Sequence, residues 1–327
     1  MNDLTKYATI FDGIKPFSGE VPLGYKVDFL GTLTDAKFLE MWGVDPKTTG
    51  GKVETTKAPT IADGEIWFEA VNWVEAAKEA RGRFVMVTLG ANYGAQAVGA
   101  YRALQALNPM PYKLIAVEPE PDNIEWTKRH MRDNGIDPAD QWIVGTAIGD
   151  NNDPVLFPVG SPGSGTQNSF AVNQYKARER YARQFRFFWY GGRARRVLRN
   201  LLLNNSTGVK RDLAPKTGYN FMAEIKMMSA VTLVDILSPF DVVDYVESDI
   251  QQSEIIVFPP FIDFLKKKVR RIHIGTHGTE THATLLELFK KGGWEIVFDF
   301  APNKTHHSTL GDFSTNDGVL TVRNPTL

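Results

Sequence analysis

The sequence contains no cysteine and no long apolar run. The absence of cysteine excludes disulfide bonds, a thiol nucleophile and zinc sites built on thiolates. No stretch reaches the ~18 apolar residues that span a bilayer, and residues 1–6 lack the basic and then apolar pattern of a signal peptide. With 327 residues, 43% of them hydrophobic and 23% charged, the chain can bury a full globular core. We therefore expect a cytoplasmic protein that attaches to a membrane, if at all, only peripherally.

A nearly balanced total charge conceals one strongly basic segment. Residues 176–211 hold eleven basic residues and a single acidic one, Glu179, which gives a local net charge of +10. The rest of the chain therefore carries −11 against a total of −1. Aromatic and aliphatic side chains are interleaved with the arginines, and Gly191-Gly192 is expected to separate two helices. The charge is thus concentrated in one helical segment.

Several interpretations of this basic segment stay open. The simplest is a helical lid with a solvated basic face. Alternatively, Arg193 and Arg196 bind an anionic acceptor such as a phosphorylated or acidic glycan, because guanidinium groups match such anions with paired hydrogen bonds. A third interpretation places the segment on an anionic membrane surface, where it reaches a lipid-linked acceptor. Nucleic acid is disfavoured because no RNA-binding motif accompanies the charge. Nothing in the sequence indicates an oligomeric state.

Beyond residue 80 the sequence alternates between strand-like and helix-like stretches. Residues 1–65 are rich in Gly, Pro and Thr, and we expect an irregular arm with a short helix near Ala36–Trp42, followed by an amphipathic helix over 66–80. The expected strands are 84–89, 114–117, 142–148, 221–229, 242–247, 271–275, 294–300 and 319–322. The expected helices are 95–107, 122–133, two short helices around Pro259-Pro260, and 280–290. Such alternation indicates an α/β fold with a doubly wound, mostly parallel sheet.

These elements predict how the chain is organised. Residues 1–80 form the N-terminal arm and helix, and residues 81–327 form the main domain. The stretch 155–230 interrupts the alternation and is expected to be an insertion or cap. Seven strands are expected in the main sheet.

One strand–turn–helix unit carries the strongest chemical signal. The run Phe84–Leu89 ends in Gly90-Ala91-Asn92-Tyr93-Gly94 and opens onto a helix, and the second strand ends in Glu118. Glycines allow the backbone to approach a ligand closely, and a helix N-terminus offers free N–H groups. A carboxylate that ends the second strand can hold both hydroxyls of a ribose. The unit therefore predicts a nucleoside-containing cofactor. The G-x-G-x-x-G of dinucleotide folds is missing, which disfavours a nicotinamide-dependent oxidoreductase.

The same residues resemble a known family. Gly90-Ala91-Asn92-Tyr93-Gly94 with Val117-Glu118-Pro119-Glu120-Pro121-Asp122-Asn123 looks like the "GANxG … EPxPxN" pair of the FkbM-type class I S-adenosylmethionine-dependent methyltransferases. Further along, Thr232–Leu237 resembles the family's "tLD" segment, and Val246–Glu254 resembles its "IKIDxxGxE". The stretches Ile272–Gly278 and Lys291–Trp294 are similar to its fifth strand and to the "GW" before its sixth.

The resemblance implies a Rossmann-like fold, S-adenosyl-L-methionine as the cofactor, and O-methylation of a hydroxyl on a sugar, glycolipid or related small molecule. It places the methionine end of the cofactor against Thr88, Gly90, Asn92 and Gly94, and the ribose at Glu118. The adenine edge would lie at the end of the third strand. The residues there are Thr146, Ala147 and Ile148.

Three residues depart from the family pattern. Thr88 stands where an acidic residue is usual, Glu247 replaces a lysine, and Gln252 replaces a glycine. These departures motivate an alternative function, a non-catalytic homologue that binds a cofactor or a glycan.

Three residues are the candidates for catalysis. Asp249 ends the fourth strand at the cofactor edge, where it can accept a proton from a hydroxyl or orient it. Glu254 begins the next helix; its alternative role is a helix-start carboxylate favoured by the dipole. His277 follows the fifth strand and is a candidate base; its alternative is a loop histidine bonded to the backbone.

Histidine is also concentrated near the C-terminus. Five of the six histidines lie between residues 273 and 307, which suggests a divalent metal site with Asp249 as a carboxylate partner. Against this, His273 and His277 share a face only if the strand continues past its expected end. His306 and His307 are expected in an exposed loop. We therefore assign no residue to a metal.

Overall fold

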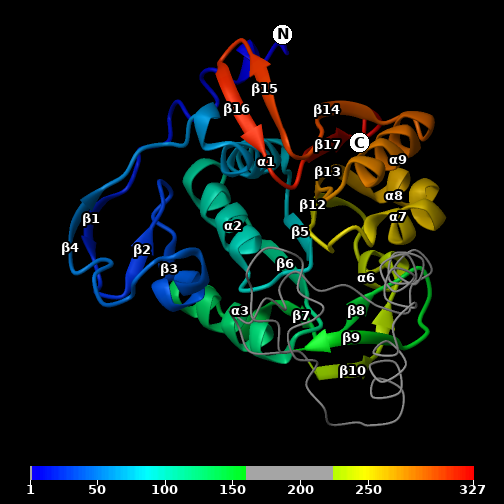
Figure 1. Cartoon of the computed structure of the whole chain (residues 1–327), viewed down its shortest axis with the longest axis horizontal. Helices are drawn as coiled ribbons and strands as arrows, with labels where there is room; N and C mark the ends of the chain where they lie inside the picture. The colour runs from blue at the N-terminus through cyan, green and yellow to red at the C-terminus, as the bar shows by residue number, and fades with distance from the viewer. Residues whose placement is uncertain (1, 160–223) are drawn as a thin grey trace, which may run out of the picture.

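The computed structural model describes residues 2–159 and 224–327. These residues build a seven-stranded sheet with strand order β14-β17-β13-β12-β5-β6-β7 (Figure 1). β17 runs antiparallel to both of its neighbours, and the other adjacent pairs are parallel. In sheet order the strands are β14 (Glu295–Phe300), β17 (Val319–Arg323), β13 (Val269–Gly275), β12 (Val243–Ser248), β5 (Phe84–Leu89), β6 (Tyr112–Val117) and β7 (Trp142–Val144). The expected doubly wound, mostly parallel sheet is confirmed.

Helices cover both faces of this sheet, and its central strands are buried throughout. All six residues of β5 and all six of β12 are buried, as parallel strands require. One hydrophobic cluster joins the sheet to α1 (Glu65–Glu79), α2 (Ala95–Leu107) and α3 (Pro121–Asp133). The cluster on the opposite face joins it to α6 (Leu233–Leu237), α7 (Glu254–Val257), α8 (Ile262–Lys268) and α9 (Thr279–Lys291). The 3-10 turn η6 (Pro259–Phe261) separates α7 from α8, as the two prolines predict.

The third predicted strand is shorter than we expected. The stretch 142–148 divides into β7 and a separate strand, β8 (Ala147–Ile148), which pairs in parallel with β11 (Ala230–Val231). Next to this pair, β9 (Val155–Val159) and β10 (Glu224–Met228) form an antiparallel ribbon. A strand over 142–148 was therefore wrong, because β8 has its own partner outside the main sheet. The part of the predicted insertion between residues 160 and 223 lies outside the described residues.

The N-terminal arm is more regular than its composition suggested. Two antiparallel pairs form there, β1 (Ser18–Val21) with β4 (Lys52–Thr55), and β2 (Tyr25–Val27) with β3 (Leu33–Asp35). The expected helix is the 3-10 helix η2 (Ala36–Trp42), and three further 3-10 turns are η1 (Thr5–Tyr7), η3 (Ile61–Asp63) and η4 (Pro138–Asp140). Strands of three or four residues are too short to show a period, which is why the sequence read as irregular.

A C-terminal hairpin that we did not predict lies against the start of the chain. β15 (Lys304–Ser308) pairs with β16 (Gly311–Thr315), and Asn2 bridges to Ser308 (Figure 1). His306 and His307 lie in β15, so the expected loop was wrong, although His307 is exposed as expected. The ring of His306 stacks on Phe313 with 5.3 Å between the ring centres, and His307 pairs with Asp312 at 2.8 Å.

The strand ends that matter for function meet at one edge. Leu89 of β5 is paired with Val117 of β6 and with Ser248 of β12, and Ser248 is paired with Ile274 of β13. The carboxyl ends of these four parallel strands are therefore level. In open α/β sheets, ligands bind beyond such an edge. Among the described residues, no helix combines the length and the apolar character needed to cross a membrane.

Candidate active site

The glycine loop between β5 and α2 is shaped by close contact with the end of β12. Gly90 adopts φ 77°, and a Cβ there would lie 2.2 Å from the carbonyl oxygen of Asp249. Only glycine fits such a position. Asn92 and Gly94 also have positive φ, 50° and 81°, and the Asn92 carbonyl accepts a hydrogen bond from Thr127. The loop is thus held between the end of β12 and helix α3.

Glu118 joins this loop to the end of β6. One carboxylate oxygen accepts the N–H of Asn92 at 2.7 Å, and the other accepts the N–H of Glu120 at 2.9 Å and the amide of Asn123 at 3.4 Å. The residue is 5% exposed. Burial raises the pKa of Glu118 to about 7, against the lowering effect of these hydrogen bonds. The carboxylate is therefore fixed in position, as holding the two hydroxyls of a ribose would require.

The residues expected at the adenine edge lie beside Glu118's strand. Thr146 follows β7, and its buried hydroxyl has no hydrogen-bond partner within the described part of the chain. Ala147 and Ile148 are buried in β8, where the N–H of Ala147 donates to the carbonyl of Ser229. The backbone of β8 is thus used in pairing with β11. Among these three residues, Thr146 is the one whose side chain offers a hydroxyl for a ligand.

Asp249 and His277 form an ion pair at the ends of β12 and β13. Nε2 of His277 lies 3.1 Å from an oxygen of Asp249, and Nδ1 lies 2.8 Å from the carbonyl of Gly275, so Nδ1 must carry a proton. Burial lowers the pKa of His277, but Asp249 and the neighbouring acids outweigh it and raise that pKa to about 10. The imidazole is therefore protonated at neutral pH.

The same pair keeps Asp249 ionised. Burial acts to raise the pKa of Asp249, but the charge of His277 and the amide of Gln251, which donates at 2.8 Å, lower it below its usual value. Its side chain is 50% exposed, whereas that of His277 is 8% exposed. The structure therefore presents an ionised carboxylate on the open side of the pair.

Glu254 supports the turn that carries Asp249. It is fully buried, and one of its oxygens accepts the N–H of Ile250 at 2.9 Å. Burial raises the pKa of Glu254 to about 7. In the same turn Gln252 donates to the carbonyl of His277.

Backbone strain is concentrated here. Gln251, Gln252 and His277 have φ of 55°, 73° and 53°, which non-glycine residues rarely adopt. Such strain gathers at functional sites.

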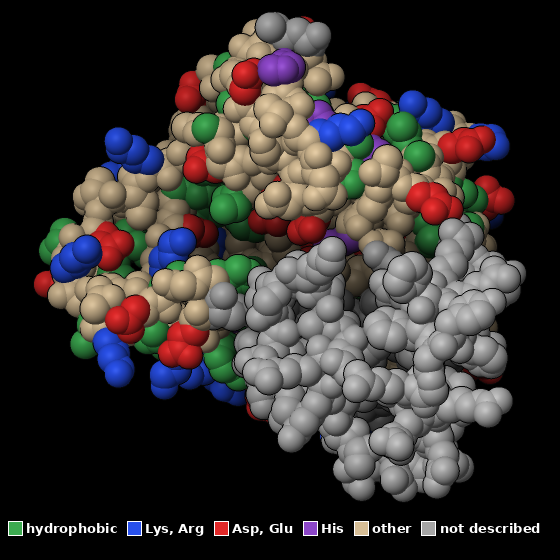
Figure 2. Space-filling view, in the orientation of Figure 1, with side chains coloured by type: hydrophobic (Ala, Val, Ile, Leu, Met, Phe, Trp, Pro, Cys, Tyr) green, Lys and Arg blue, Asp and Glu red, His purple; other side chains and the backbone are tan. Residues whose placement is uncertain are grey.

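Two acids at this edge were missed by the sequence analysis. Glu69 projects from α1 and bonds to Gln96, and burial raises its pKa to about 7. Asp317 lies in the turn before β17, and its carboxylate is 3.8 Å from His277. Figure 2 shows acidic side chains and a histidine gathered near the centre of one face. No sequence signal marks these acids. Glu69 reaches the site only because α1 packs on the sheet, and Asp317 only because β17 runs antiparallel to its neighbours, so that the turn before it lies at this edge.

The remaining predicted site residues separate into three groups. Thr88 lies in β5 at the same edge, with its buried hydroxyl unpartnered among the described residues. The histidines bond elsewhere: His273 to Thr321 at 2.8 Å, and His282 to Asp299 at 2.8 Å. Within residues 2–159 and 224–327, no three His, Asp or Glu side chains are grouped to hold a metal ion. Arg193 and Arg196 lie outside the described residues.

Comparison with known proteins gives similarities of structure only. No protein-family model matches the chain. No curated protein matches it either. Among solved structures, a methyltransferase FkbM from Methylobacillus flagellatus is 12% identical, with 78% of this chain and 53% of that chain covered and a TM-score of 0.39. A precorrin-6Y C5,15-methyltransferase from Geobacter metallireducens is 10% identical, with 78% and 86% covered and a TM-score of 0.36.

A third similar structure is fibrillarin from Aeropyrum pernix in complex with natively bound S-adenosyl-L-methionine. It is 10% identical, 77% of this chain and 75% of that chain are covered, and the TM-score is 0.31. The chain spans about half the length of the Methylobacillus flagellatus protein.

Proposed function

We propose that this protein is an S-adenosylmethionine-dependent O-methyltransferase that acts on a hydroxyl of a sugar, glycolipid or related small molecule. The observation that carries the proposal is Glu118, a buried carboxylate at the end of β6 that is tied to the backbone of the Gly90–Gly94 loop. A fixed carboxylate beside a glycine loop suits a ribose. The ion pair of Asp249 and His277 lies at the same edge and supplies a polar group for an acceptor.

The residues at this edge fit the cofactor chemically. The hydroxyls of Thr88 and Thr146 are buried without partners among the described residues. Such buried groups are costly unless a ligand satisfies them. S-adenosylmethionine, when bound, supplies an electrophilic methyl group on a sulfonium. The chain's own residues would hold it and orient the acceptor.

Asp249 is the group that would act on the acceptor. Its ionised, half-exposed carboxylate can accept a hydrogen bond from the acceptor hydroxyl and take the proton as the oxygen gains the methyl group. His277 is already protonated, so its role in this proposal is to hold Asp249 in place and ionised rather than to act as the base. Glu254 accepts a hydrogen bond from the backbone N–H of Ile250 and would thereby fix the turn that follows Asp249.

The acceptor's charge is a separate part of the proposal. The described edge is acidic, so an anionic acceptor, or attachment to an anionic membrane surface, would depend on the basic segment 176–211 and on Arg193 and Arg196. A neutral sugar hydroxyl needs neither. Testing phosphorylated and neutral glycans in parallel separates these two acceptor classes.

Transfer of a radiolabelled methyl group from S-adenosylmethionine to a panel of neutral and anionic glycans tests the proposal. We expect labelled product with the wild-type protein, and a loss of about a hundredfold or more with Asp249→Asn, which keeps the shape but removes the proton acceptor. Asp263→Asn on α8, an exposed site, is the matched control and should leave transfer unchanged. Cofactor binding without transfer to any acceptor would favour a non-catalytic binding protein, and binding of NAD alone would favour an oxidoreductase.

A further inference from the structure

An unpartnered buried carboxylate lies deep at the carboxyl edge of the sheet. Glu247 of β12 is paired with Thr88 of β5 and with His273 of β13, so the three side chains project from the same face. Glu247 is 3% exposed, and its Oε2 has no hydrogen-bond partner among the described residues. The hydroxyl of Thr88, which is 1% exposed, is unpartnered as well. Two neighbouring polar groups thus lie buried and unsatisfied.

The nearby cations of the described chain are all engaged elsewhere. Arg271 is bonded to Asn72 and paired with Glu75 and Glu79. His277 is paired with Asp249. Burial and the charge of Arg271 lower the pKa of His273 to about 3, so this neighbour of Glu247 is neutral.

The ionisable groups that face Glu247 are mainly acidic. They come from α1, from β12 and the turn after it, and from β13: Glu69, Tyr245, Asp249, Glu254 and His273. Burial, followed by the charges of Asp249, Glu69 and Glu254, raises the pKa of Glu247 far above its usual range. This shift favours the protonated form of Glu247 when no ligand is bound. A cation placed beside it would favour the ionised form.

We propose that Glu247, together with the hydroxyl of Thr88, is the subsite for the cationic amino-acid end of S-adenosylmethionine. The inference rests on the proposed function and names the residues that serve this end of the cofactor. In the sheet order, β5 and β12 follow β6, so Thr88 and Glu247 are the next side chains along the edge from Glu118. A ligand whose ribose lies at Glu118 and which extends across the sheet reaches them with its sulfonium and ammonium groups.

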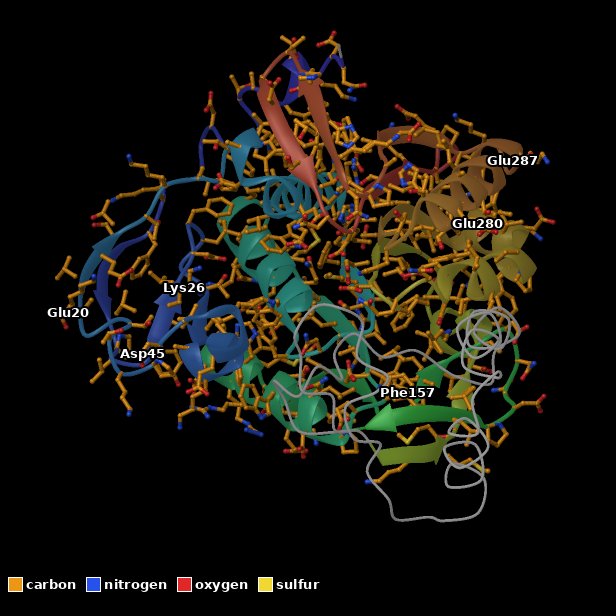
Figure 3. All side chains as sticks on the ribbon, in the orientation of Figure 1. Glu20, Lys26, Asp45, Phe157, Glu280 and Glu287 are labelled. Carbon is orange, nitrogen blue, oxygen red and sulfur yellow. The ribbon has the colours of Figure 1, made fainter. Side chains whose placement is uncertain are left out.

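Calorimetric titration of three ligands into Glu247→Gln tests this subsite. Gln has the shape of the protonated side chain but cannot ionise. S-adenosylmethionine carries both cationic groups, S-adenosylhomocysteine carries only the ammonium, and 5′-methylthioadenosine carries neither. Glu287→Gln is the control, because Glu287 points outward from α9 in Figure 3 and is paired with Lys291.

We expect Glu247→Gln to lower the affinity for S-adenosylmethionine by about ten- to a hundredfold, and the affinity for S-adenosylhomocysteine by less. Binding of 5′-methylthioadenosine should stay within about twofold, which also shows that the variant's site is folded. Titration in buffers of different ionisation enthalpy should show about one proton fewer released by the variant than by the wild type.

The outcomes separate the subsite from the function on which it rests. If the wild type binds none of the three ligands, both proposals fail. If the wild type binds S-adenosylmethionine and the variant binds it equally well with the same proton release, the subsite alone is overturned. If the variant loses affinity equally for all three ligands, Glu247 only shapes the pocket, and its role as a counter-ion is overturned.

Discussion

Replacing Gly90 by Ala tests the closest approach in the candidate site. An Ala Cβ at this position would lie 2.2 Å from the carbonyl oxygen and 3.0 Å from the carbonyl carbon of Asp249. Both atoms belong to the backbone at the end of β12, so neither can rotate away as a side chain would. The glycine loop and the turn that carries Asp249 must therefore separate.

The magnitude follows from two contributions. Left-handed backbone at φ 77° costs an L-residue about 1–2 kcal/mol. The overlap with the backbone adds to this, and we expect a total of about 4 kcal/mol or more, in the range reserved for severe steric mutations. Gly135→Ala is the matched control, because Gly135 has φ 76° and nothing within 4 Å of its Cβ position. Gly135→Ala should therefore lose only the about 1–2 kcal/mol that comes from the left-handed backbone.

Gly94 gives an intermediate case. Its Cβ would lie 3.0 Å from the methyl group of Thr127, which can shift a little. Urea unfolding should therefore rank the three alanine variants by loss of stability as Gly90, then Gly94, then Gly135. Calorimetry should show loss of S-adenosylhomocysteine binding in Gly90→Ala and unchanged binding in Gly135→Ala. Equal stability and equal affinity in Gly90→Ala and Gly135→Ala would refute the close approach.

Three further predictions follow from the buried charges and from the arm. The free energy of unfolding of the ligand-free protein should fall between about pH 4.5 and 7, by about 1.4 kcal/mol per pH unit for each glutamate that keeps its proton only in the folded state. A raised pKa stabilises the fold fully below the unfolded pKa of about 4.5, and that stability is lost as the pH rises through the folded value of about 7. The glutamates with a pKa raised to about 7 are Glu69, Glu118 and Glu254. Urea titrations across this window that show a flat or rising stability would contradict the assignment. His277→Gln removes the charge that lowers the pKa of Asp249, so the acidic limb of the pH–rate profile of methyl transfer should move to higher pH; an unchanged profile would remove His277 from this role. Phe38→Ala should cost about 3–5 kcal/mol in urea unfolding, because the buried Phe38 ring stacks against Tyr93 of the glycine loop, whereas the exposed Leu23→Ala should change little; equal effects would show that the arm does not support the loop.

Much of the fold could be predicted because its signals are local. The apolar run 84–89 and the helix 95–107 have the predicted bounds, and the two prolines at 259 and 260 divide the helical stretch where expected. The errors fall where pairing is non-local. β8 leaves the main sheet because β11 returns beside it, and the β15–β16 hairpin places two histidines on a strand. Neither partner can be inferred from the strand's own residues.

The site shows the same division. Gly90, Glu118 and Asp249 were found from their places at the ends of predicted strands, since parallel strands bring such ends to one edge. Their interactions were not predictable, because the contact between Gly90 and Asp249 depends on the register of β5 and β12. The segment predicted to be "tLD" has a local explanation in the structure: Thr232 and Asp235 form a capping box at the start of α6. Glu69 carried no signal at all, since an acid on an amphipathic helix is ordinary.

The most direct test of the central claim is the calorimetric titration of S-adenosylmethionine, S-adenosylhomocysteine and NAD into the wild type and into Glu118→Ala. We predict saturable binding of the first two ligands at one site, no binding of NAD, and a loss of affinity of about a hundredfold in the variant, which lacks the carboxylate for the ribose hydroxyls. Glu125→Ala, an exposed site on α3, should behave as the wild type. Binding of NAD alone, or binding of S-adenosylmethionine that Glu118→Ala leaves unchanged, would contradict the assignment of this edge of the sheet.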